Sequence, residues 1–130
     1  MSHGTIVAMY SSQVLDHFEH PRNAGELENP DGVAQIENPA CGDILKLSLK
    51  ISDNTIRAAR FLAKGCVAAM ACGSALTELI QGRTIEEAGR LKREDVVAAV
   101  GGLPAASMHA SHLAVEALTA ALNSLKESAS

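Results

Sequence analysis

The stretch that decides the fold is residues 43–64, which read DILKLSLKISDNTIRAARFLAK. In its first nine residues apolar and polar side chains alternate, with the apolar ones at Leu45, Leu47, Leu49 and Ile51. A period of two predicts a strand with one buried face. Residues 52–54 are Ser-Asp-Asn, which favour a turn because Asp and Asn tolerate left-handed backbone. Residues 55–64 then predict a returning strand, so the stretch forms an antiparallel hairpin.

At Gly65 the period of the apolar residues changes to that of a helix. The stripe that follows has the spacing i, i+3, i+7 and i+10 and consists of Ala69, Cys72, Leu76 and Leu79. It predicts a helix that runs to about Gln81 and is capped by Gly82. Thr84 and Glu87 form a capping box that starts another helix. Further helices are predicted around residues 96–100 and over residues 108–125.

Upstream of the hairpin the pattern is less regular. Residues 11–20 predict a short helix that Pro21 ends. Residues 22–39 are rich in Asn, Gly and Pro, which favour a loop interrupted by a short strand over residues 33–37. The predicted class is therefore α+β, a small three-stranded antiparallel sheet packed on one face by helices. We expect residues 9–130 to form a single domain and residues 1–8 to be a flexible extension.

Composition and charge exclude several classes of function. Aromatic residues are 2% of the 130 residues, too few for the platforms on which single-stranded nucleic acid stacks. The net charge is −4, so the chain lacks the basic footprint of a nucleic-acid-binding protein. No apolar run is long enough to span a bilayer, and no secretory signal pattern is seen. We expect a cytoplasmic protein whose cysteines are free or bound to metal.

Two of the three cysteines lie where elements of secondary structure begin. Gly42 between Cys41 and Asp43 would let both side chains turn toward one point, although a packed cysteine and a turn glycine explain the same residues. Cys66 lies at a strand-to-helix junction, where the helix dipole favours a thiolate suited to nucleophilic attack or metal binding. Cys72 lies on the apolar stripe of its helix and is predicted to be a core residue.

The histidines offer fewer candidates. His109 and His112 are at i and i+3 near the start of the last helix, an arrangement that fits either a metal-binding pair or two solvated side chains. His17 and His20 are expected at the surface. Spacing alone therefore indicates two thiols, an aspartate and a histidine that could converge on a metal ion.

Several motifs, taken in order, carry a resemblance to a known family. They are Tyr10-Ser11, His20-Pro21-Arg22-Asn23-Ala24-Gly25, Asn38-Pro39-Ala40-Cys41-Gly42-Asp43, Phe61 to Cys66, Thr77-Glu78-Leu79, and Leu103-Pro104 with His109 and Ser111. Together they resemble the iron–sulfur cluster assembly scaffolds of the IscU and NifU N-terminal type, over residues 9–126. The resemblance implies a three-stranded sheet with helices packed on it and a site at one exposed end.

The same resemblance implies a function and its ligands. In that family three cysteines, an aspartate and a histidine surround a [2Fe–2S] cluster or a zinc ion, and the matching positions are Cys41, Asp43, Cys66 and His109. The expected function is a scaffold or carrier, not an enzyme, that binds iron or a labile [2Fe–2S] cluster. The implied partners are a cysteine desulfurase and apo iron–sulfur proteins, and a second copy of the chain could share one cluster.

The chain departs from the family's motifs in two places. Ala110 stands where the family has its third cysteine, so a cluster here would be held by few thiolates and should be labile. The four remaining groups also suit tetrahedral zinc, and a zinc-binding relative that relays persulfide or regulates a desulfurase is the alternative. In the family, an Hsp70-type chaperone recognises a Leu-Pro-Pro-Val-Lys segment. The matching residues here are Leu103-Pro104-Ala105-Ala106-Ser107, and this difference argues against such a chaperone as a partner.

Overall fold

The structure, a computed structural model, describes residues 10–39 and 42–129, and for residues 126–129 it describes the backbone alone. Its elements in chain order are helix α2 (Ser12–Glu19), strands β1 (Gly32–Asn38), β2 (Asp43–Ser52) and β3 (Thr55–Lys64), helices α3 (Val67–Ile80), α4 (Ile85–Gly89) and α5 (Arg93–Ala99), the 3-10 turn η1 (Ala105–Ser107) and helix α6 (His109–Ala129). Among these residues, no helix is long and apolar enough to cross a membrane.

The three strands form one antiparallel sheet in the order β1-β2-β3. Asp43 at the start of β2 faces Asn38 of β1, and Ile44 faces Lys64 at the end of β3. The hairpin turn uses left-handed backbone, with φ of 52° at Asp53 and 60° at Asn54. The α+β class and the three-stranded sheet predicted from the period-two pattern are confirmed.

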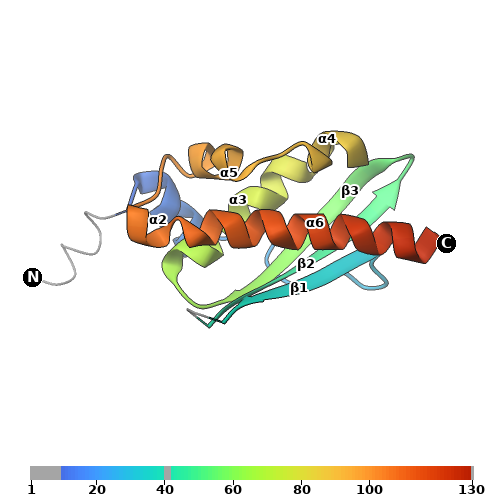
Figure 1. Ribbon diagram of the computed structural model, residues 1–130. Helices are drawn as coiled ribbons and strands as arrows, with labels where there is room; N and C mark the ends of the chain where they lie inside the picture. Colours follow the sequence, from blue (N-terminus) through green and yellow to red (C-terminus); the bar gives the residue numbers. More distant parts are fainter. Residues whose placement is uncertain (1–9, 40–41, 130) are drawn as a thin grey trace, which may run out of the picture.

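The core lies between the sheet and two helices. Helix α6 packs against β1 and helix α3 against β3, so both cover the same face of the sheet (Figure 1). The leucines of β2 point into this layer and are buried. At Gly73 a Cβ atom would lie 2.6 Å from Cδ2 of Phe61, so the glycine lets α3 approach β3 closely. Close packing of α3 on β3 fixes where the first turn of α3, and with it Cys66, lies.

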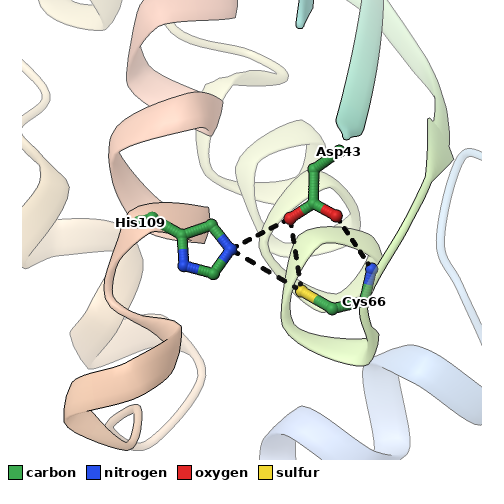
Figure 2. A group of neighbouring side chains, drawn as sticks. All are labelled: Asp43, Cys66 and His109. Atoms are coloured by element: carbon green, nitrogen blue, oxygen red, sulfur yellow. Dashed lines mark hydrogen bonds and ion pairs between the residues drawn. The ribbon is translucent and has the colours of Figure 1, made fainter. Parts of the chain in front are cut away.

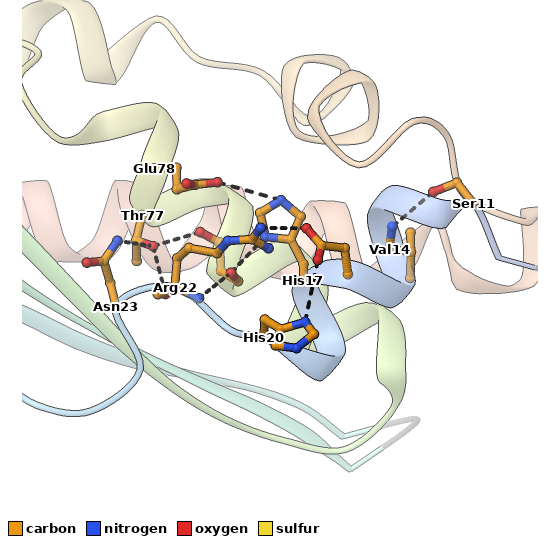
Figure 3. Close-up of polar contacts among 10 residues, drawn as sticks. Ser11, Val14, His17, His20, Arg22, Asn23, Thr77 and Glu78 are labelled. Carbon is orange, nitrogen blue, oxygen red and sulfur yellow. Dashed lines mark hydrogen bonds and ion pairs between the residues drawn. The ribbon is translucent and has the colours of Figure 1, made fainter.

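The prediction that His17 lies at the surface is wrong. Its side chain points from α2 toward α3 (Figure 3). It is buried, and its Nδ1 lies 2.8 Å from Oγ of Ser74. The same Ser74 oxygen accepts the backbone N–H of Arg22 at 2.8 Å. Ser74 is fully buried and needs polar partners, and α2 supplies one of them by packing against α3. His20 is exposed, as predicted.

Candidate metal centre

Three of the four predicted ligands lie at ends of secondary-structure elements that meet at one end of the molecule. Asp43 is the first residue of β2, Cys66 links β3 to α3, and His109 is the first residue of α6. Their side chains point toward one another in Figure 2. The fold therefore gathers residues that are 23, 43 and 66 positions apart in sequence.

The three side chains are within ligation distance of one point. Nε2 of His109 lies 2.9 Å from Oδ2 of Asp43, and Sγ of Cys66 lies 3.5 Å from the same oxygen. Sγ of Cys66 and Nε2 of His109 are 4.0 Å apart. One donor atom from each residue lies within 4.8 Å of the other two, the only such grouping of His, Cys, Asp and Glu in the part of the chain that the structure describes. A sulfur, a nitrogen and an oxygen donor suit zinc or iron.

Local backbone structure holds Cys66 and Asp43 together. Cys66 is the N-cap of α3, and its Sγ accepts the backbone N–H of Ala69 at 3.4 Å. Its own backbone N–H donates to Oδ1 of Asp43 at 3.2 Å. The Asp43 side chain is 3% exposed, whereas that of His109 is 28% exposed. The centre is thus closed on the Asp43 side and reachable from solvent on the other side.

The prediction that its helix position favours the Cys66 thiolate is wrong for the metal-free chain. Burial raises the pKa of the Cys66 thiol above its ordinary value, and the negative charge of Asp43 adds to this effect. The N–H of Ala69 lowers the pKa but is outweighed. A bound cation would reverse the balance, because a coordinating thiol loses its proton to the metal.

The other cysteines and His112 do not join this group in the part of the chain that the structure describes. Cys41 lies outside the described residues, so its place as a ligand stays a prediction. Cys72 is fully buried in the core, as predicted, and burial raises its pKa to about 12. His112 is exposed, with Nε2 2.7 Å from Oε1 of Glu116, which matches a solvated helix side chain rather than a metal ligand.

Comparison with known proteins decides the family. The NifU-like N terminal domain family matches the chain over residues 9–130. The chain belongs to this family. The iron–sulfur cluster assembly scaffold protein IscU 1 of Archaeoglobus fulgidus is 47% identical over 114 residues, which are 88% of this chain and 74% of that protein. The scaffold protein IscU of Escherichia coli K12 is 40% identical over 121 residues, covering 90% of this chain and 94% of the relative.

Solved structures agree on the fold of this NifU-like domain. The crystal structure of a nitrogen-fixing NifU-like protein (N-terminal) from Brucella abortus has a TM-score of 0.75 and is 20% identical, and it covers 94% of this chain and 97% of the other. At that identity the likeness supports the α+β fold and nothing further.

Ala110 lies directly after His109 in the first turn of α6. It is 1% exposed and belongs to the hydrophobic core cluster between the helices and the sheet. A methyl group at this position adds packing to the core and offers no donor atom to the centre. Of the four ligands expected from the sequence, the structure thus brings Asp43, Cys66 and His109 together, and Cys41 stays a prediction.

Proposed function

We propose that the chain is an iron–sulfur cluster assembly scaffold, which binds a labile [2Fe–2S] cluster as cargo and passes it to apo-proteins. The observation that carries the proposal is the convergence of Asp43, Cys66 and His109 within 4.8 Å at one end of the molecule. Family membership supports it, because relatives 40–47% identical are named as cluster assembly scaffold proteins. The protein is then a binding module and not a catalyst.

Each side chain of the centre has a distinct part in holding the cargo. Cys66 supplies a soft thiolate after giving up its proton, and we propose Cys41 as the second sulfur ligand. His109 supplies the neutral imidazole nitrogen Nε2, and Asp43 supplies Oδ2 while its Oδ1 stays bonded to the Cys66 N–H. Imidazole and carboxylate are harder ligands that can take up a proton, so the cluster should be released readily.

The exposed side of the centre suits delivery and transfer. His109 and Cys66 are partly exposed, so the ligands of an incoming or outgoing cluster can be exchanged one at a time without unfolding. The partners of this function are a cysteine desulfurase that supplies sulfur and apo iron–sulfur proteins that receive the cluster. We place the protein in the cytoplasm, where cysteines stay reduced.

Anaerobic reconstitution with ferrous iron, cysteine and a cysteine desulfurase tests the proposal. The two histidines in the first turns of α6 give a matched pair, because His109 lies in the centre and His112 is exposed outside it. We expect His109→Ala to lose most of the visible cluster absorbance and His112→Ala to keep it. Equal cluster yield from both variants, or a wild-type protein that takes up zinc but neither iron nor sulfide, would refute the scaffold.

A further inference from the structure

In the turn between β3 and α3, the backbone of a glycine lies against the carboxylate of Asp43. Gly65 separates Lys64, the last residue of β3, from Cys66, the N-cap of α3. We propose that Gly65 is a positioning residue of the metal centre, because the absence of a side chain there lets the Asp43 carboxylate lie against the Cys66 backbone. The inference rests on the proposed function, which makes Asp43 and Cys66 ligands.

The contact with Asp43 leaves no room for a side chain. A Cβ atom at Gly65 would overlap Oδ1 of Asp43, and it would lie 2.7 Å from Cγ and 3.1 Å from Cα of the same residue. The carboxylate cannot turn aside without loss, since Oδ1 accepts the Cys66 N–H and Oδ2 lies 2.9 Å from Nε2 of His109. An L side chain at position 65 must therefore move the carboxylate away from both partners or open the turn.

The backbone conformation is a separate requirement. Gly65 has φ of +133°, a region that L residues rarely adopt. Gly82, which follows the other end of α3, has φ of +87°, but a Cβ there would meet no described atom within 4 Å. Both glycines that flank α3 thus have positive φ, but a side chain would collide with a neighbouring residue that the structure describes only at Gly65.

As a consequence, the two oxygens of the Asp43 carboxylate have different roles in the centre. With Gly65 in place, Oδ1 is held by the Cys66 backbone N–H, and Oδ2 is left to face Sγ of Cys66 at 3.5 Å and Nε2 of His109. One oxygen fixes the position of the group and the other is offered to the metal. Gly65 is therefore a determinant of metal affinity although it contributes no donor atom.

The experiment compares Gly65→Ala with Gly82→Ala in metal binding. The zinc affinity of the metal-free chain is measured by competition with a chromogenic chelator, and cobalt(II) substitution reports the thiolate-to-metal absorption and the ligand-field bands. We expect Gly65→Ala to weaken zinc binding on the order of 10- to 100-fold and to shift the cobalt bands. Gly82→Ala should lower the Tm through its strained φ and leave both metal readouts unchanged.

A measurement in the Asp43→Ala variant separates the effect of the Gly65–Asp43 contact from the effect of backbone strain at position 65. In Asp43→Ala the carboxylate is gone, so adding Gly65→Ala should change zinc affinity by less than about threefold. An equal loss of affinity in both backgrounds would overturn the inference, because Gly65 would then act through the turn alone. A wild-type chain without any thiolate-to-cobalt absorption would instead contradict the proposed function, so the two failures are distinguishable.

A third variant covers the case in which Gly65→Ala does not fold. The Gly65–Cys66 bond is a natural junction for native chemical ligation, because the carboxyl-terminal fragment begins with cysteine. Ligation can place D-alanine at position 65, whose methyl group replaces the glycine hydrogen that does not point to Asp43. D-alanine accepts positive φ, so we expect wild-type zinc affinity and cobalt bands. A loss as large as that expected for Gly65→Ala would overturn the inference.

Discussion

Removal of the Ser74 hydroxyl should disturb the packing of α2 on α3. Its Oγ accepts the Arg22 backbone N–H and lies against Nδ1 of His17, each at 2.8 Å, and Ser74 is 0% exposed. Ser74→Ala leaves a buried imidazole nitrogen and a partly buried N–H without partners. At about 1–3 kcal/mol for each of these two unsatisfied groups, we expect a loss of roughly 2–6 kcal/mol in the free energy of unfolding. For a chain of this length the Tm should fall by roughly 10 °C.

Urea unfolding of the metal-free chain, followed by circular dichroism, measures this loss. Ser124→Ala is the matched control, because Ser124 also accepts a backbone N–H, that of Val33 at 3.1 Å, but in an exposed contact on α6. Water can replace the serine there, so the control should cost less than about 1 kcal/mol. Similar losses in the two variants would show that the buried polar cluster does not tie α2 to α3.

Three further predictions concern groups in and beside the core. Burial, followed by the charge of Arg22, lowers the pKa of His17 below its ordinary value of 6.5, so the unfolded chain binds the extra proton more readily. The contribution of His17 to the free energy of unfolding is therefore constant above pH 6.5 and decreases as pH falls through 6.5 toward the lower folded pKa. In urea titrations of the metal-free chain, His17→Gln should weaken this loss of stability at acid pH, and an unchanged pH dependence would contradict the assignment to His17. Cys72→Ser should lower the free energy of unfolding by about 1–3 kcal/mol and leave the zinc content unchanged, and loss of zinc without loss of stability would make Cys72 a ligand. Ala110→Cys places a thiol on the buried residue directly after His109 and should increase the yield of reconstituted cluster and its lifetime against a chelator, and equal values in wild type and variant would show that a side chain at this core position does not reach the centre.

The sheet could be predicted from the sequence because its signal is local. Alternation in residues 43–51 and the Asp53-Asn54 turn specify the hairpin by themselves, and the structure has these strands with nearly the predicted bounds. The burial of His17 could not be predicted in this way, because it depends on Ser74, which is 57 positions away. A helical pattern of eight residues does not show which neighbour its polar side will meet.

In the metal centre, too, contacts between residues far apart in the sequence could not be predicted from local patterns. Spacing alone indicates that two thiols, an aspartate and a histidine could converge on a metal ion, and the family's motifs identify Asp43, Cys66 and His109 as expected ligands. The pKa of Cys66 was predicted with the wrong sign, because the helix start is visible in the sequence and the burial and the Asp43 carboxylate are not. The sequence marks Gly65 as the point where the period of the apolar residues changes, whereas its close contact with Asp43 exists only in the folded chain.

Transfer of the cluster to an apo-protein tests the central claim most directly. The chain, reconstituted with a [2Fe–2S] cluster, is mixed with an apo-ferredoxin in the presence of an iron chelator, and the circular dichroism of the holo-ferredoxin is followed with time. We expect holo-ferredoxin to form faster than from free iron and sulfide at the same concentrations, and His109→Ala to abolish the advantage while His112→Ala retains it. Ferredoxin that stays in its apo form while the chelator takes the iron would contradict the account.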